Sequence, residues 1–275
     1  MKVAPFNSSS HFARASSMHH SRTESSQTLG SLREDFLNQF FDTNGNLRNE
    51  YQKVAYPDGG EYIGQYQDCR SGRGIYSFPN KDVYMGNWKE DKFSGEGLYV
   101  YATNEKYQGK FSEGKKHGRG IYYYRSGAIY DGEWNKERKN GFGIYTYPNS
   151  EKYEGNWLNG EKHGKGAYYF KNGDKYIGDW VKNKKNGHGV LEYSSGAVYD
   201  GEWVDDRATN KGEIIYSNKD KYEGNFLNGK KHGKGVYHYQ TGGKYKGEWL
   251  NDKKHGYGVI EYANGDRYEG NWKNG

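Results

Sequence analysis

Aromatic, glycine and polar residues alternate in a short segment that recurs through most of the chain. A tyrosine is followed two residues later by glycine and four residues later by another aromatic residue, and the positions between them are mostly polar. Strict alternation of this kind predicts a β-strand with one aromatic face. The first interval between the leading tyrosines is 22 residues and the other eight are 23, which is the signature of a repeat architecture. These tyrosines are Tyr62, Tyr84, Tyr107, Tyr130, Tyr153, Tyr176, Tyr199, Tyr222, Tyr245 and Tyr268.

The segment that follows each of these strands predicts a second strand. With the tyrosine counted as position 1, position 5 is always aromatic and holds all seven tryptophans of the chain. A turn comes next, as in LNGEKH (158–163), and glycines at positions 12 and 14 open a strand that carries an apolar residue at position 16. Asn-Gly pairs such as Asn172-Gly173 then lead to the next tyrosine, and Asn-Gly between two strands is a strong hairpin signal. Position 18 is aromatic throughout: Phe78, Tyr101, Tyr124, Tyr147, Phe170, Tyr193, Tyr216, Tyr239 and Tyr262.

Each repeat is therefore predicted to be one β-hairpin that buries its aromatic face by stacking on its neighbours. We expect the glycines at positions 3, 12 and 14 to leave room for aromatic rings of neighbouring strands. The fold class that follows is all-β: an elongated, single-layered, twisted antiparallel sheet, roughly 85–90 Å long at about 4.8 Å per strand, without a globular core. In the seventh repeat Asn210 replaces the glycine at position 12, and this change should be tolerated because asparagine accepts left-handed backbone.

The chain divides into four parts on this pattern. Residues 1–30 form a Ser-rich tail that we expect to be disordered. Residues 31–45 predict a short amphipathic helix, with Ser31 and Glu34 as a capping box and a role in covering the first edge of the array. Residues 46–61 are a linker and half a repeat, and residues 62–275 are nine repeats plus a truncated tenth.

Composition supports an ordered chain with an unusual core. The 275 residues include 41 glycines and 29 tyrosines, and mean hydropathy is −1.23. Disordered chains are poor in aromatic residues, so the core is expected to consist of tyrosine, tryptophan and glycine. Cys69 is the only cysteine, which excludes an intrachain disulfide and fits a reducing, cytoplasmic compartment. The net charge of +6 favours acidic partners without selecting one, and the motifs give no reason to expect nucleic acid.

The sequence motifs that could form a phosphate-binding loop, a zinc site or a catalytic pair do not have the spacing that these sites need. The stretch Gly160-Glu-Lys-His-Gly164-Lys165 has one residue too few for a phosphate-binding loop. Four histidines share position 11, but side chains one repeat apart start roughly 10 Å from each other, too far to share a zinc ion. Acidic residues at position 4 recur with the repeat, whereas a catalytic pair should be singular. We predict no catalytic residue, no metal site and no cofactor. The histidines are His117, His163, His232 and His255.

The pattern Tyr-x-Gly-x-Trp followed by Asn-Gly-x-x-His-Gly-x-Gly resembles the signature of the MORN repeat. The resemblance covers about residues 54–275. It implies an elongated single-layered sheet of consecutive hairpins, and roles as a scaffold, in dimerisation, and as a module next to the cytoskeleton or a membrane. It also implies that such arrays can stand alone or precede a catalytic domain such as a lipid kinase or a protein methyltransferase.

Two surfaces are candidates for binding. We expect the aromatic face to bind proteins, since a single-layered sheet should leave it partly exposed. Its candidate residues are Tyr107, Trp134, Tyr153, Trp157, Tyr176, Trp180, Tyr199, Trp203, Tyr222 and Trp249. The basic turns could meet acidic phospholipid or an acidic protein tail, or could be solvated turns. They contain Lys115, Lys116, Arg138, Lys139, Lys184, Lys185, Lys230, Lys231, Lys253 and Lys254.

Three functional hypotheses follow from these surfaces. The first is a non-enzymatic scaffold for other proteins in a cytoskeletal or ciliary assembly, where the cytoskeletal setting comes from the family resemblance. The second is a peripheral membrane adaptor that binds acidic phospholipid through the basic turns. The third is the regulatory region of a larger enzyme. The last repeat stops after its first strand, and an open edge there favours a homodimer through the C-terminal repeats.

Overall fold

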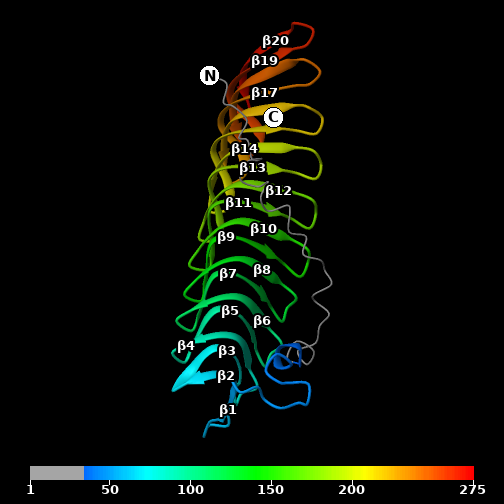
Figure 1. Ribbon diagram of the computed structural model, residues 1–275. Helices are drawn as coiled ribbons and strands as arrows, with labels where there is room; N and C mark the ends of the chain where they lie inside the picture. The colour runs from blue at the N-terminus through cyan, green and yellow to red at the C-terminus, as the bar shows by residue number, and fades with distance from the viewer. Residues whose placement is uncertain (1–33) are drawn as a thin grey trace, which may run out of the picture. The chain divides into compact units, whose positions relative to one another are not determined.

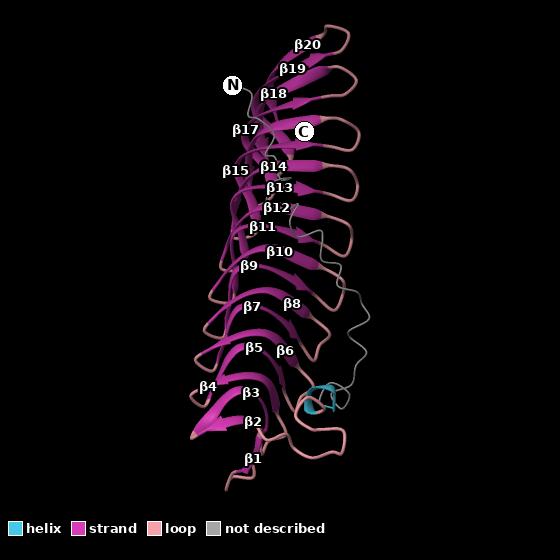
Figure 2. Ribbon diagram, in the orientation of Figure 1, coloured by secondary structure: helices cyan, strands magenta, loops and turns pink. Residues whose placement is uncertain are grey.

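A computed structural model describes residues 34–275, and the chain divides into two units at Tyr51 and Gln52. The unit Gln52–Gly275 is one antiparallel sheet of 20 strands. Each strand pairs with the strand that precedes it and the strand that follows it in the sequence, so the hairpins are stacked in chain order (Figures 1 and 2). The predicted all-β sheet of consecutive hairpins is confirmed.

The strands have a regular length that reflects the repeat. From β2 onward a strand of about seven residues, which carries the tyrosine, alternates with one of about nine residues. The bounds are β1 (Gln52–Ala55), β2 (Glu61–Gln67), β3 (Cys69–Ser77), β4 (Val83–Lys89), β5 (Lys92–Val100), β6 (Lys106–Ser112), β7 (Lys115–Tyr123), β8 (Ile129–Asn135), β9 (Arg138–Thr146), β10 (Lys152–Leu158), β11 (Glu161–Tyr169), β12 (Lys175–Val181), β13 (Lys184–Glu192), β14 (Val198–Val204), β15 (Arg207–Ile215), β16 (Lys221–Leu227), β17 (Lys230–His238), β18 (Gly243–Leu250), β19 (Lys253–Tyr262) and β20 (Arg267–Trp272).

The helix of the N-terminal unit ends earlier than the sequence predicts. Among the described residues, 34–37 are helical, and turns and a bridge between Phe41 and Leu47 take the place of the predicted helix over residues 38–45. The reason is Asp42, whose carboxylate accepts the backbone N–H groups of Asn44 and Asn46 at 2.9 Å each. An aspartate that bonds its own backbone in this way competes with helix formation. Ser31 of the predicted capping box and the tail 1–30 lie outside the described residues.

Two-residue turns close the hairpins on one margin of the sheet. Between β10 and β11, Asn159 has φ 52° and Gly160 has φ 94°, and most of the equivalent turns likewise have positive φ at both residues. Turns of this type match the natural twist of paired strands, and asparagine and glycine suit them because both accept positive φ. In the first repeat, which is one residue shorter, Asp68 alone (φ 58°) separates β2 from β3.

The glycine at position 12 forms a β-bulge instead of making room for a ring. In β11 the pairing register shifts between Gly155 and Trp157 of the neighbouring strand, and Gly164 within the shift has φ 62°. A Cβ atom on Gly164 would meet the Asn156 side chain and no aromatic ring, so that part of the prediction was wrong. Asn210 occupies this site in the seventh repeat with φ 53°, which confirms that asparagine is tolerated there.

The glycines at positions 3 and 14 face each other beneath the tyrosine ring of their own repeat. Gly155 pairs with Gly166 across β10 and β11, and the ring of Tyr153 lies over both. A Cβ atom on Gly166 would lie 2.6 Å from Cζ of that ring. The hydroxyl of Tyr153 donates a hydrogen bond to the carbonyl oxygen of Asn156 at 2.9 Å. Close approach of the ring therefore explains these two glycine columns, as predicted.

Replacing Gly166 with alanine should test this contact directly. The added methyl group overlaps a ring that cannot move without losing its hydrogen bond, so we expect the free energy of unfolding to fall by about 2–3 kcal/mol. The matched control is Gly196→Ala, where φ is 87° and the added Cβ would meet no atom within 4 Å. Backbone strain alone should cost the control about 1 kcal/mol. Urea unfolding followed by tryptophan fluorescence measures both, and equal losses would contradict the ring contact.

Candidate functional site

The aromatic residues at positions 1 and 5 form one continuous column, which we call the inner aromatic column. The ring of Trp157 packs in a T-shaped arrangement against two tyrosine rings. The distance between ring centroids is 5.2 Å to Tyr153 in its own repeat and 5.4 Å to Tyr130 in the preceding repeat. Its Nε1–H donates a hydrogen bond to the carbonyl oxygen of Gly143, also in the preceding repeat, at 3.2 Å. The same contacts link successive repeats from Tyr62 to Trp272, with phenylalanine in place of tryptophan twice.

The ten residues predicted to bind proteins all belong to the inner aromatic column. The structure brings them together on one face, but it leaves each side chain only 0 to 6% exposed. Buried to this degree, they hold the repeats together and present almost no surface to a partner. Alternation in the sequence identified the face, and it could not show how closely neighbouring repeats cover each ring.

A basic residue at position 10 covers each tryptophan. Lys139 Nζ lies 4.2 Å from the ring centroid of Trp157, and the seven such distances range from 4.2 to 5.2 Å. Attraction between a cation and an aromatic ring is strongest for tryptophan. The pairs are Arg70–Trp88, Lys116–Trp134, Lys139–Trp157, Lys162–Trp180, Lys185–Trp203, Lys231–Trp249 and Lys254–Trp272.

The sequence itself contains a signal for the pairing of position 10 with tryptophan, although this pairing was not predicted. Where position 5 is Phe111 or Phe226, position 10 of the preceding repeat is Phe93 or Ala208 and carries no charge. A two-residue turn also places position 10 directly opposite position 5, as in the pairing of Lys162 with Trp157. Position 10 therefore lies on the aromatic face.

The ten residues of the predicted basic turns therefore fall into two sets. Lys116, Lys139, Lys185, Lys231 and Lys254 are at position 10, where they lie partly or fully buried on tryptophan rings. The residues of the edge that remain exposed are at position 9: Lys115, Arg138, Lys184, Lys230 and Lys253. Only this second set is free to meet a flat anionic surface, and within it Lys184 already pairs with Asp205 at 3.3 Å.

Burial changes the acidity of the groups in this interior. It lowers the pKa of Lys139 to about 8, with a smaller contribution from the charge of Lys162. It also lowers the pKa of Lys162 to about 8, although the nearby carboxylates of Asp206 and Glu151 act in the opposite direction. It also lowers the pKa of Lys185. Burial raises the pKa of Tyr216 and Tyr245 to about 12, because the phenolate would lose its hydration.

Acidic residues at position 22 make a second link between repeats that the sequence did not reveal. Asp82 accepts hydrogen bonds from the Tyr99 hydroxyl at 2.7 Å and from the Ala102 N–H at 2.8 Å in the next repeat. Glu151 likewise accepts from the Tyr168 hydroxyl at 2.7 Å, and this bond lowers the pKa of Glu151. These carboxylates therefore have structural partners.

A second line of rings, the outer aromatic column, follows positions 16 and 18 near one margin. Tyr122 and Tyr124 lie 4.4 Å apart, and Tyr124 reaches Tyr145 of the next repeat at 5.6 Å. Contacts of this kind run without a break from Tyr76 to Phe170. Aliphatic residues at position 16 interrupt the column later, at Leu191, Ile214 and Ile260. The rings at position 18 are half-buried, and Tyr193 and Tyr262 are exposed.

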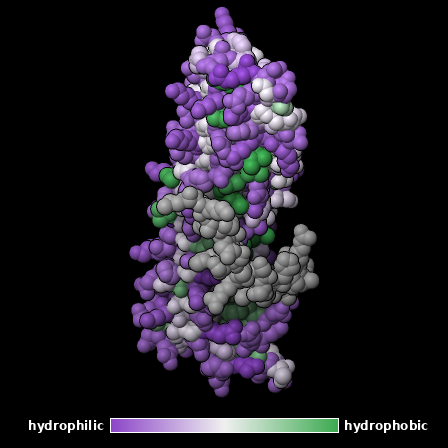
Figure 3. Space-filling view, turned by 90° about the horizontal axis from the view of Figure 1, so that it is seen from above, coloured by the Kyte–Doolittle hydropathy of each residue, from purple (hydrophilic) through white to green (hydrophobic). Residues whose placement is uncertain are grey.

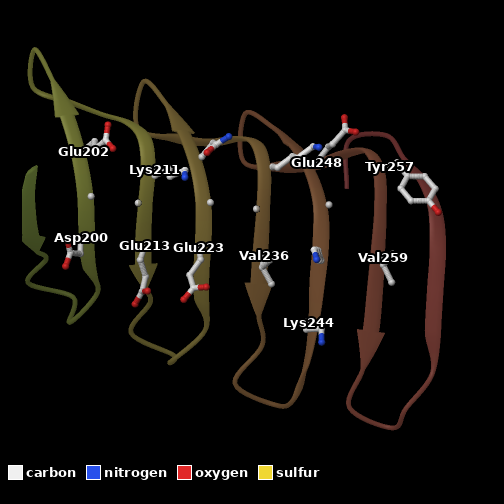
Figure 4. Close-up of a pocket in the computed structure, with 18 of the residues that line it drawn as sticks. Asp200, Glu202, Lys211, Glu213, Glu223, Val236, Lys244, Glu248, Tyr257 and Val259 are labelled. Atoms are coloured by element: carbon white, nitrogen blue, oxygen red, sulfur yellow. The ribbon is translucent and has the colours of Figure 1, made fainter. Parts of the chain in front are cut away.

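The opposite face of the sheet is mainly polar. Seen from above, the surface of the molecule is likewise largely hydrophilic, with scattered hydrophobic patches (Figure 3). Over β13 to β20 this face has an open hollow lined by Asp200, Glu213, Glu223 and Lys244 among others (Figure 4). Its charges compensate each other, as in the ion pair of Lys244 with Glu261 at 3.0 Å. The acidic and basic side chains come from several strands and lie along the hollow, so they do not converge on a single point.

The histidines at position 11 lie in the bulges. The Nδ1 atoms of His232 and His255 are buried and have no hydrogen-bond partner in the described part of the chain. No group of three His, Cys, Asp or Glu side chains that could hold a metal ion occurs among residues 34–275. Within the same residues, no helix is long and apolar enough to cross a bilayer.

Comparison with known proteins identifies the repeat. The MORN repeat family model matches residues 62–83, 84–106, 107–129, 130–152, 153–175, 176–198, 199–221, 222–244, 245–267 and 268–275. No curated protein matches the chain.

Two solved structures show weak similarity to this chain. A TCP10 domain of Danio rerio CPAP in complex with a STIL peptide is 10% identical, covers 81% of this chain and 99% of its own, and gives a TM-score of 0.43. The SAS-4 TCP domain of Drosophila melanogaster in complex with a proline-rich motif of Ana2 is 13% identical, with coverages of 63% and 89% and a TM-score of 0.38. At these TM-scores the superpositions carry no inference about what this chain binds.

A double-mutant cycle should detect the coupling between Lys139 and Trp157. Lys139→Ala and Trp157→Phe are each expected to destabilise the array, and the pair should cost about 1 kcal/mol less than the sum because both remove one interaction. Arg138→Ala combined with Trp157→Phe is the control cycle, since Arg138 is exposed at position 9. Urea unfolding measures both cycles. Equal coupling energies would show that Lys139 contributes nothing specific to the tryptophan.

Stability should depend on alkaline pH with two opposite slopes. Between about pH 8 and 9.5 the unfolded lysines hold more protons than the folded ones, so the urea midpoint should rise with pH. Above about pH 10 unfolded tyrosines ionise while buried ones keep their protons, so the midpoint should fall. In the double variant Lys139→Met, Lys162→Met the rise should become smaller, because Lys185 still has a lowered pKa, and the fall should stay. A midpoint that falls steadily from pH 8 in the parent chain would contradict the lysine assignment.

Proposed function

The chain belongs to the MORN repeat family, and we propose that it is a non-enzymatic scaffold that binds an extended protein segment along the outer aromatic column. The observation that supports this proposal is the unbroken line of ring contacts from Tyr76 to Phe170, in which the rings at position 18 are half-buried. The inner aromatic column is not suited to bind such a segment, because contacts between repeats bury its rings. The rings of the outer aromatic column at position 18 are partly exposed, so a partner can contact them while the contacts between repeats stay intact.

The spacing of the outer aromatic column suits a proline-rich segment. Two strands per repeat at about 4.8 Å give a pitch of roughly 9.6 Å. A polyproline II helix has three residues per turn at about 3.1 Å each, or roughly 9.3 Å per turn. The two spacings differ by only about 0.3 Å per repeat. Every third residue of such a segment would therefore meet the same position of successive repeats over the first five repeats.

Chemistry also favours this class of ligand. Proline-rich segments dock in grooves lined by aromatic rings, and their preformed conformation loses little entropy on binding. An ordinary extended strand would seek an open sheet edge, but β3 to β11 are paired on both sides. The surface of the first five repeats thus favours side-chain stacking over strand addition.

Binding of a labelled peptide tests the proposal. The probe is a fluorescein-labelled 15-residue peptide with proline at every third position, titrated by fluorescence anisotropy. Tyr124→Ala and Tyr147→Ala should each weaken binding at least tenfold, because the tyrosine ring that packs against a proline of the ligand is lost while the inner column stays intact. Tyr239→Ala is the matched control at the same position, next to the interruption at Ile260, and should change affinity less than twofold.

Two results would overturn the proposal. One is the absence of binding at millimolar peptide, and the other is an affinity that all three substitutions change equally. Thermal melts of each variant show whether the array has stayed folded, so that a loss of binding can be assigned to the contact surface.

We further propose that this scaffold works in a cytoskeletal or ciliary assembly, as the family resemblance implies. Detergent extraction of cells that express the tagged chain is the appropriate measurement. Retention in the insoluble cytoskeletal fraction would support this setting. Release from a membrane fraction would contradict it and would favour contact of the exposed position-9 residues with acidic phospholipid instead.

A further inference from the structure

A cation at position 10 can have an acidic partner at position 8 of the next repeat. Arg70 pairs with Asp91 at 2.9 Å between Nε and Oδ1. Lys116 pairs with Glu137 at 3.0 Å between Nζ and Oε2. Each of these carboxylates also accepts the backbone N–H of its partner. In these two repeats the chain itself therefore neutralises the charge that lies over the tryptophan.

Two neighbouring lysines, Lys139 and Lys162, lack such a partner. The repeat after Lys139 has Gly160 at position 8, and the repeat after Lys162 has an amide there, that of Asn183. Asn183 accepts the backbone N–H of Lys162 at 2.9 Å, so it keeps the hydrogen bond of the acidic residues without their charge. Among the described residues, neither ammonium group forms an ion pair with a carboxylate.

Both ammonium groups lie beside the outer aromatic column. Nζ of Lys139 is 4.7 Å from the ring centroid of Tyr145. Nζ of Lys162 is also 4.7 Å from a ring at position 16, that of Tyr168. Each of these rings contacts a half-buried ring at position 18 with 4.6 Å between centroids. A flat anionic surface does not reach the half-buried lysines, but a segment that lies along the outer aromatic column runs past both of them.

The surroundings of Lys139 disfavour its charge. Burial lowers the pKa of Lys139 to about 8, and the charge of Lys162 contributes in the same direction. The other groups close to its Nζ are the rings of Tyr130, Tyr145 and Trp157. A carboxylate placed beside this ammonium group would favour its charged form.

Lys162 has a similar environment with carboxylates farther away. Burial lowers its pKa to about 8, Asp206 and Glu151 act against this shift, and Lys185 adds to it. The carboxylate of Glu151 already accepts a hydrogen bond from the hydroxyl of Tyr168 at 2.7 Å. Lys162 therefore also gains from a carboxylate that a partner supplies.

We propose that the proline-rich segment on the outer aromatic column is acidic, and that two of its carboxylates, three residues apart, pair with Lys139 and Lys162. This inference rests on the proposed function and names the class of segment. The two lysines are one repeat apart, roughly 9.6 Å, and equivalent side chains of a polyproline II helix recur at roughly 9.3 Å. A segment can lie along the column in either direction, and one of the two turns its acidic side towards the lysines.

Two peptides test the proposal by fluorescence anisotropy. One is fluorescein-labelled and has five Pro-Glu-Ala triplets, and the other has Gln in place of each Glu. At pH 7 and low ionic strength the glutamate peptide should bind about tenfold more tightly, because partly buried charges are screened little. We call this ratio of affinities the acidic preference.

The acidic preference should depend on pH in a way that identifies the lysines. A lysine with a pKa of about 8 is mostly neutral at pH 9, so the preference should fall below about twofold there. Exposed lysines with an ordinary pKa near 10.4 would keep the preference at pH 9.

Three variants locate the contact. The double variant Lys139→Met, Lys162→Met keeps an apolar lid over each tryptophan and should lose the acidic preference. Asn183→Asp supplies Lys162 with a carboxylate from the chain itself and should reduce the preference about threefold. Lys254→Met is the matched control, since Lys254 also faces a glycine at position 8, Gly275, but lies four repeats beyond Lys162. Thermal melts show whether each variant is folded.

The outcomes separate this inference from the proposed function. If neither peptide binds, both fail. If the glutamine peptide binds and the glutamate peptide binds no better, only the acidic segment is excluded. The same holds if the preference persists at pH 9 or in the double variant. Vesicles of phosphatidylcholine with phosphatidylserine that bind the parent chain but not the double variant would assign the two lysines to a membrane instead.

Discussion

The array depends on one contact: a tyrosine ring that lies over two facing glycines of its own hairpin. Because neither glycine has a Cβ, the ring of Tyr153 reaches the backbone of β10 and β11 and bonds the carbonyl oxygen of Asn156. A ring fixed in this way offers its edges to two tryptophans, Trp157 of its own repeat and Trp180 of the next. Each tryptophan then bonds a carbonyl of the preceding repeat. The sheet is held together by the repetition of this unit along the chain.

The lysines at position 10 explain how so hydrophilic a chain can have a core. A single-layered sheet has no second layer to cover its aromatic face, and aliphatic lids would expose a large apolar surface to water. A lysine instead lays its hydrocarbon stem and its charge over the tryptophan, as Lys139 does over Trp157, and remains partly hydrated. The arrangement costs some desolvation, which is why burial lowers the pKa of Lys139 to about 8. It also removes half of the basic edge from the exposed surface.

The repeat period and the alternation of residues were sufficient to predict the hairpins, their order and the aromatic face. They were also sufficient for Asn210, since a left-handed bulge position needs only a residue that accepts positive φ. Alternation assigns a residue to a face, however, and does not report how far neighbouring repeats close over it. The burial of Trp157 depends on Lys139 and Tyr130, which are 18 and 27 residues away in the chain. The helix predicted over 31–45 does not continue beyond residue 37, because the spacing of apolar residues does not show the turn that the side-chain bonds of Asp42 stabilise.

The residues that form the interior are nearly the same in every repeat, so the repeats differ mainly near the margins of the sheet. At these margins the first half of the array differs from the second. The outer aromatic column is continuous as far as Phe170, in the fifth repeat, and is interrupted at Leu191 in the sixth. Exposed aliphatic residues at position 6 begin with Leu158 in that same fifth repeat and continue to Leu250 in the ninth. Neither change disturbs the tyrosine and tryptophan contacts, which pass through the fifth repeat unaltered. One sheet can therefore present different surfaces on its two halves while its interior stays the same. The repeats fix the separation between them, and a scaffold needs this property more than any single strong site.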